Sequence, residues 1–176
     1  ERQRDIAQEA LVESDRQRDI AQAVNDFLNK DLLGQANPYG GAAHDAKLRD
    51  VLDRASEAIE QRLDDQSLVQ ASIRGTLGRT YYHLGAYDQS NHHLERAIAV
   101  YARELGDAHV LTNELRHVQV QSNMQNFKLK EAEALLDIFL KVADEHLGPS
   151  HELTAKAYGN LGVLRKRQGN FAASEQ

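Results

Sequence analysis

Apolar residues recur every three or four positions along most of the chain, which is the spacing of one face of an α-helix. Between residues 69 and 105 two such faces follow one another, separated by Gly85. The first face consists of Val69, Ile73, Leu77, Tyr81 and Leu84, and the second of Tyr87, Ser90, Leu94, Ala97, Tyr101 and Leu105. This pattern predicts two consecutive helices that fold back on one another as a hairpin.

The pattern returns with a period of 42 residues, which separates the stretch LGDAHVLT at 105–112 from LGPSHELT at 147–154. Other columns at this offset hold Tyr87, Leu129 and Phe171, then Ser90, Ala132 and Ser174, and finally Leu94 with Leu136. A single hairpin cannot bury its apolar face, whereas stacked hairpins bury a continuous core and form a superhelix with a concave inner surface. The sequence therefore predicts a stack of hairpins in which small residues mark close helix crossings.

Glycines mark the predicted helix ends. Gly85 is expected to end the first helix of a hairpin, and Gly106 and Gly148 the second helices, because glycine readily adopts the left-handed conformation of such ends. Phe127 stands at the position equivalent to Gly85 in the middle unit. The candidate N-caps of the helices that follow are Asp107 and Ser150. His109 and His151 are expected in the first turn of these helices, where they would make a capping or packing contact.

Residues 77–101, LGRTYYHLGAYDQSNHHLERAIAVY, carry the spacing of small, large and aromatic residues typical of a tetratricopeptide repeat. The positions concerned are Leu77, Gly78, Tyr81, Gly85, Tyr87, Ser90, Leu94 and Ala97. The segment resembles that family, and the 42-residue period is similar to the longer repeats of kinesin light chains and many bacterial proteins. The resemblance implies an all-α, right-handed superhelix of helical hairpins, preceded here by a long N-terminal helix.

The repeat divides the chain into an N-terminal lead-in helix at residues 1–33 and a repeat array at residues 45–176. The array comprises a degenerate unit at 45–66, full units at 67–108 and 109–150, and a partial unit at 151–176. Because the partial unit stops within an expected hairpin, we expect Leu161 and Leu164 to lack a cover. In the lead-in, RQRDIAQ at 2–8 returns at 16–22, so a dimerising coiled coil is an alternative to a solvated helix.

Residues 24–112 also resemble the segment that follows the single membrane span in bacterial serine/threonine protein kinases with tetratricopeptide arrays. A similar segment occurs in membrane-tethered winged-helix regulators. This resemblance implies a sensor or docking segment of a larger bacterial signalling protein, and it leaves open whether the segment is cytoplasmic or extracytoplasmic. The chain contains no Gly-rich loop, HRD or DFG motif, so a kinase domain would lie upstream of Glu1 and we expect this chain to be non-catalytic.

Composition narrows the chemistry further. A net charge of -6 and a pI near 5.7 disfavour a nucleic acid partner, because a phosphate-binding surface is cationic. The absence of cysteine excludes disulfides and thiolate chemistry, and no apolar run is long enough to cross a bilayer. The eight histidines form no HExxH motif and no pair at i and i+4 spacing, so we predict no metal site, no cofactor and no catalytic pair.

The remaining candidate for function is the concave surface, which the first helix of each hairpin is expected to line. Side chains between the packing positions of these helices would bind a protein or an extended peptide, with the Asn160 amide pairing with the peptide backbone. The candidate binding residues are Arg79, Tyr82, His83, His117, Gln121, Gln125, Lys156, Asn160 and Arg167, with Glu114 and Met124 beside them. Cations and neutral donors together favour a partly acidic peptide. The alternatives are ordinary solvated helix residues and a structural or dimerising spacer whose groove stays empty.

Overall fold

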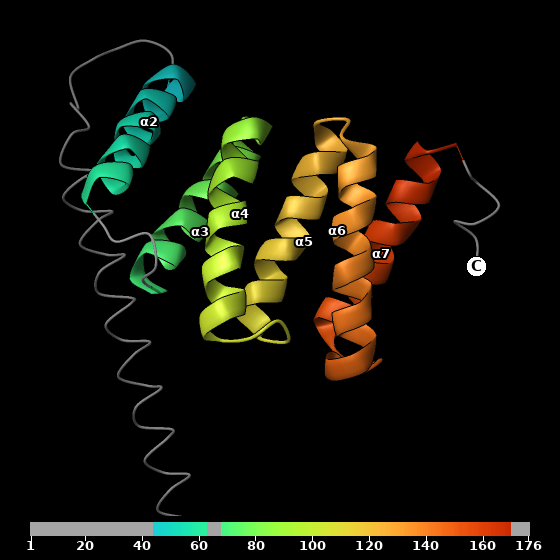
Figure 1. The fold of residues 1–176 in the computed structure, drawn as a ribbon. Coiled ribbons are helices and arrows are strands. Elements are labelled where there is room, and N and C mark those ends of the chain that lie inside the picture. The colour runs from blue at the N-terminus through green and yellow to red at the C-terminus, as the bar shows by residue number, and fades with distance from the viewer. Residues whose placement is uncertain (1–43, 63–67, 170–176) are drawn as a thin grey trace, which may run out of the picture. The chain divides into compact units, whose positions relative to one another are not determined.

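A computed structural model describes residues 44–62 and 68–169 of the chain (Figure 1). Every regular element within these ranges is a helix, and no strand occurs in them. The predicted all-α fold is thereby confirmed for the described residues. The chain divides into two compact units, Glu1–Ile73 and Arg74–Gln176. The predicted lead-in helix at 1–33, with its heptad spacing, lies outside the described residues.

The described part of the first unit contains α2 (His44–Arg62) and the beginning of α3 (Leu68–His83), which continues into the second unit. The buried apolar residues of α2 are Val51, Leu52, Ala55 and Ile59. Steps of one, three and four residues place them on one side of the helix, as in an amphipathic helix.

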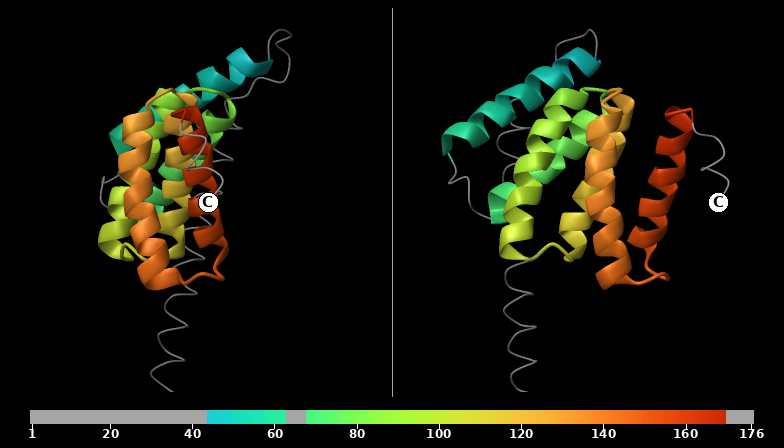
Figure 2. Two further views of the ribbon diagram at one scale, coloured as in Figure 1. Left: turned by 90° about the vertical axis from the view of Figure 1, so that its right-hand side faces the viewer. Right: turned by 45° about the vertical axis from the view of Figure 1, so that its right-hand side comes forward.

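The described part of the second unit holds the end of α3 and the helical elements that follow it. These elements are α4 (Tyr87–Glu104), α5 (Val110–Gln125), α6 (Leu129–Val142), a short π-helical turn η2 (Ala143–Leu147) and α7 (Glu152–Arg167). Figure 1 and Figure 2 show α4, α5, α6 and α7 side by side in chain order. Each contacts the next, and α5 also contacts α7. First helices of successive hairpins are therefore neighbours, as stacking requires.

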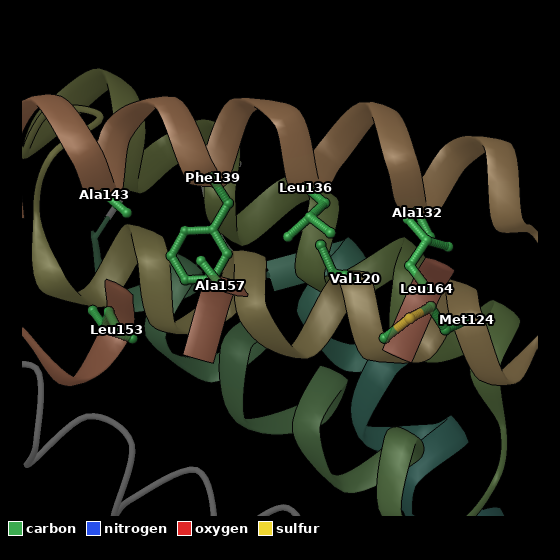
Figure 3. Packing of buried hydrophobic residues seen from close by; sticks show 9 residues of the cluster. All are labelled: Val120, Met124, Ala132, Leu136, Phe139, Ala143, Leu153, Ala157 and Leu164. Carbon is green, nitrogen blue, oxygen red and sulfur yellow. The ribbon is translucent and has the colours of Figure 1, made fainter. Parts of the chain in front are cut away.

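A cluster of buried apolar residues joins α5, α6 and α7 (Figure 3). Its members are Val120, Met124, Ala132, Leu136, Phe139, Ala143, Leu153, Ala157 and Leu164. In Figure 3 the α6 side chains Leu136 and Phe139 point towards Val120 of α5 and Ala157 of α7. The apolar face of one hairpin is thus covered by the first helix of the next, which is how a repeat array builds its core.

The crossing of α3 and α4 is tight at Gly78. A Cβ atom placed on Gly78 would lie 2.6 Å from Cγ and 2.8 Å from Cδ2 of Leu94. Both residues are buried, and Leu94 is 0% exposed. The two helices approach so closely because residue 78 has no side chain, and any larger residue would push Leu94 away.

The helix-ending glycines adopt the predicted left-handed conformation, with φ of 71° at Gly85, 98° at Gly106 and 82° at Gly148. Phe127 adopts the same conformation, with φ of 58°, although it is not glycine. Phe127 is 84% exposed. Its neighbours on both sides hold this turn, because Asn126 Nδ2 and Lys128 Nζ donate hydrogen bonds of 2.9 and 2.7 Å to Asp88 Oδ1. The left-handed turn is therefore imposed by the hairpin on an unfavourable residue.

The prediction that Asp107 or Ser150 caps the following helix is wrong. The N-caps are His109 and His151, whose Nδ1 atoms accept hydrogen bonds of 3.2 and 3.1 Å from the backbone N–H groups of Leu111 and Leu153. Asp107 and Ser150 come before these caps in the chain and are therefore too early to serve. The Asp107 carboxylate instead pairs with Arg116, and the backbone carbonyl of Asp107 accepts a 2.7 Å hydrogen bond from Asn113 Nδ2.

The prediction that Leu161 and Leu164 lack a cover is also wrong. Leu164 is 0% exposed within the core cluster, and Leu161 packs against that cluster. Both leucines pack towards the preceding unit, so their burial does not need a following helix. The exposed apolar residues of α7 are Tyr158, at 50%, and Val163, at 45%.

Candidate functional site

A cleft with a volume of about 240 Å³ lies within the second unit, between α3, α5 and α7. It is lined by Arg79, Tyr82, His83, Glu114, His117, Val118, Gln121, Leu153 and Lys156. The helices α3, α5 and α7 are the first helices of three successive hairpins. The cleft therefore lies on the surface where the sequence predicts the concave wall.

The helical period places the lining residues of α5 together. Glu114, His117, Val118 and Gln121 are spaced by three, one and three residues, so they share one face of the helix. An adjoining side of α5 carries Val120 and Met124, which belong to the core cluster. Packing of α5 on α6 therefore turns the polar face of α5 towards the cleft.

Positive charge dominates the cleft. Arg79 and Glu114 form an ion pair of 3.0 Å that joins α3 to α5, with side chains 44% and 39% exposed. Lys156 pairs at 2.7 Å with Glu152, one turn earlier on α7, and Glu152 is not part of the lining. Two permanent cations thus face one lining carboxylate, and the geometry suits a guest that carries oxygen acceptors or negative charge.

His117 is a half-buried polar group of the lining. Its ring lies 6.4 Å from the Phe139 ring, centroid to centroid, and Phe139 is 0% exposed. Burial lowers the pKa of His117 below its usual value, and the positive charge of Lys156 lowers it further. The imidazole is therefore neutral near pH 7, so it can donate one hydrogen bond and accept one.

Six of the nine predicted binding residues line this cleft, and three do not. Gln125 and Arg167 lie together, because Arg167 donates a 3.0 Å hydrogen bond to Gln125 Oε1 and another to the Met124 carbonyl. Asn160 is only 4% exposed, and its amide nitrogen Nδ2 lies 2.9 Å from His117 Nδ1. Met124 is 3% exposed in the core cluster, so the prediction that it projects into the groove is wrong.

The sequence also missed two apolar residues of the lining, Val118 and Leu153. Both belong to helices that the pattern predicts, but neither was singled out as a groove residue. The only available signal was their place beside predicted groove residues: Val118 follows His117, and Leu153 precedes Lys156 by three positions. They give the cleft an apolar floor and wall between the polar groups.

Two further properties concern the described residues only. None of the helices within 44–62 and 68–169 combines the length and the apolar character needed to cross a membrane. The same ranges contain no group of three or more histidine and acidic side chains arranged to hold a metal ion.

Comparison with known protein families gives a match to part of the chain. Residues 70–111 match the sequence model of the tetratricopeptide repeat, a segment that contains most of α3, all of α4 and the turn after it. No curated protein matches the chain. The match supports a tetratricopeptide-repeat protein and a module for protein–protein interaction, since such repeats are generally non-catalytic scaffolds.

Proposed function

We propose that the second unit binds an extended peptide in the cleft between α3, α5 and α7. The observation that carries this proposal is the convergence of side chains from three successive repeat units on one cleft. A peptide crossing the first helices would meet Arg79 and Tyr82, then His117 and Gln121, and then Lys156. Three helices in register offer a continuous surface to an extended chain.

The size of the cleft favours a peptide over a small molecule. Pockets for small molecules are typically about 300–1,000 Å³ and enclose most of the ligand, whereas this cleft holds about 240 Å³. That volume accommodates a few side chains of a longer guest that continues along the surface. Gln121 and His117 provide donors and acceptors for backbone groups, and Val118 and Leu153 provide apolar contact.

The charge of the cleft favours acidic residues in the guest. Arg79 and Lys156 are held near the cleft by Glu114 and Glu152, so their positions are fixed before a ligand arrives. Attraction between these cations and a carboxylate would speed association and weaken as salt screens it.

The test uses the whole chain and two pools of short fluorescent peptides of random sequence, one with fixed glutamates and one with fixed lysines. We expect polarisation to show binding of the glutamate pool, with an affinity reduced about tenfold by Arg79→Ala, the equivalent of about 1.4 kcal/mol. Arg103→Ala is the matched control, because Arg103 is an exposed α4 arginine that also pairs with a glutamate, Glu104 at 2.8 Å, outside the cleft. Equal losses for both variants, or no binding by either pool, would refute the proposed site.

We further propose that the chain is a docking or sensor segment of a larger bacterial signalling protein. The support is the resemblance of residues 24–112 to the segment that follows the single membrane span in bacterial serine/threonine protein kinases with tetratricopeptide arrays. The gene sequence preceding the codon for Glu1 tests this role. A membrane span with a kinase or winged-helix domain upstream would support it, and an unrelated domain would contradict it.

A dimerising spacer is the second candidate function, and the observation that favours it is the repeated RQRDIAQ motif at 2–8 and 16–22. Light scattering of the chain with and without residues 1–22 distinguishes the two functions. A dimer that becomes a monomer on truncation, together with a cleft that binds neither peptide pool, would favour the spacer. Peptide binding that survives truncation would favour the peptide-binding module.

A further inference from the structure

The contact between Asn160 and His117 joins α7 to α5 across one repeat unit. The amide nitrogen of Asn160 lies 2.9 Å from His117 Nδ1. A side-chain amide nitrogen donates hydrogen bonds and cannot accept them, so Nδ1 must be the acceptor in this contact. A neutral imidazole that accepts at Nδ1 carries its proton on Nε2.

The two residues occupy different places relative to the cleft. His117 belongs to the lining, whereas Asn160 is 4% exposed and does not. Within the described residues, the His117 ring makes its hydrogen bond with Asn160, and this bond uses Nδ1. The nitrogen left for a ligand is therefore Nε2, with its hydrogen.

The groups around His117 support the neutral state. Arg79 and His83 of α3 and Lys156 of α7 line the same cleft, and the positive charge of Lys156 repels an imidazolium. Glu114 of α5 is the one lining carboxylate, and it is already paired with Arg79 at 3.0 Å. The element α6 contributes the apolar Phe139 ring to the contacts of His117. Burial is also the main cause that lowers the pKa of His117.

From this geometry we propose that Asn160 is a positioning residue, which holds His117 as the Nε2–H tautomer so that the cleft presents a neutral donor to a carbonyl oxygen of the bound peptide. Asn160 thus acts on the ligand through His117. A ligand group that only donates, such as an ammonium or an amide N–H, would find no acceptor at this point of the cleft. The part of the proposal that concerns the ligand rests on the proposed peptide binding, but the tautomer is a property of the free protein.

The decisive measurement is a long-range ¹H–¹⁵N correlation spectrum of the whole chain with ¹⁵N-labelled histidine. We expect His117 to show an unprotonated Nδ1 and a protonated Nε2 near pH 7, and to take up a second proton only below the usual pKa of histidine. A proton on Nδ1 in the wild-type protein would overturn the proposal. Because this outcome is read from the wild-type chain, it does not depend on whether a variant folds.

Two variants test the cause. Asn160→Asp replaces the donor by a carboxylate of the same shape, which accepts from Nδ1–H, so the proton should move to Nδ1 and the pKa of His117 should rise. Gln121→Glu is the matched control, because it adds the same charge to the cleft while Asn160 still donates to Nδ1, and it should leave the neutral ring protonated on Nε2. An unchanged tautomer in a folded Asn160→Asp variant, or an equal change in both variants, would overturn the role of Asn160.

The ligand arm uses the tightest-binding peptide from the glutamate pool. Asn160→Asp should weaken its binding about five- to tenfold, the equivalent of one lost hydrogen bond of about 1 kcal/mol or slightly more. Unchanged affinity despite a changed tautomer would contradict the donor role of His117. If no peptide binds, the proposed function fails, while the spectrum of the free protein still decides the tautomer.

Discussion

The close approach of α3 and α4 at Gly78 predicts opposite effects for one substitution at two glycines. In Gly78→Ala the new methyl group would meet Leu94 Cγ at 2.6 Å, about 1 Å closer than the optimal separation of two carbon atoms. Overpacking of this kind costs about 1–3 kcal/mol. Alanine is more favourable than glycine within a helix by about 1 kcal/mol. The free energy of unfolding should therefore fall by about 1 kcal/mol.

Gly159→Ala is the control for helix propensity alone. Gly159 lies inside α7, and a Cβ atom placed there meets nothing within 4 Å. The same substitution should therefore raise the free energy of unfolding by about 1 kcal/mol. For a chain of this length each kcal/mol corresponds to about 2–4 °C in Tm, so the two variants should melt on opposite sides of the wild type.

The assay is thermal and urea unfolding followed by circular dichroism, extended to a double-mutant cycle with Leu94→Ala. Leu94→Ala alone should cost about 2–5 kcal/mol, because Leu94 is fully buried. In the presence of Gly78→Ala it should cost about 1–3 kcal/mol less, since the shortened side chain removes the overlap. If Gly78→Ala stabilises as much as Gly159→Ala does, or if the double mutant is additive, the reasoning from close approach is refuted.

Three further predictions follow from other contacts. Phe127→Gly should raise the free energy of unfolding by up to about 1 kcal/mol in thermal melts, because relief of the left-handed strain exceeds the entropy cost of glycine, whereas Phe127→Ala keeps the strain and should bring no gain. His109→Ala should cost about 0.5–2 kcal/mol in urea unfolding, since it removes the cap of α5, and a neutral result would contradict the capping role. The pKa of His117 is lowered in the folded state from 6.5, so the unfolded chain binds the proton first as the pH falls. The free energy of unfolding should therefore decline as the pH falls from about 6.5 to the folded pKa. His117→Gln should flatten this part of the pH dependence, measured by urea unfolding.

Features that depend on one residue type at one position could be predicted from the sequence. Gly85, Gly106 and Gly148 end helices where their spacing indicates, because left-handed backbone is a local requirement that glycine meets. The buried faces of α3 and α4 also follow from periodicity, as Leu77 and Leu94 show with exposed fractions of 1% and 0%. The match of residues 70–111 to the tetratricopeptide repeat falls on the same two helices.

Features that depend on distant neighbours could not be predicted. The sequence places Asn160 on the concave side of α7, but its partner is His117, 43 positions away, and only the packing of α7 on α5 brings the two together. For His109 and His151 the sequence left a capping contact and a packing contact open, for a different reason. General cap preferences favour Asp107 and Ser150 over histidine, while the return of His109 as His151 after one repeat was the signal that pointed to the right residues.

Contacts between repeat units join residues that are close in the sequence, and this affects how the chain folds and how it unfolds locally. The polar contacts between helices described above join residues no more than 43 positions apart. Nucleation can therefore begin in any hairpin and spread to its neighbours without closing a long loop, which favours rapid folding. The same architecture lets one helix detach while the others stay packed, and detachment of α7 would remove Lys156 and Leu153 from the cleft. A guest that spans the three hairpins should accordingly slow amide hydrogen exchange in α7, because it would hold α7 in place beside α5.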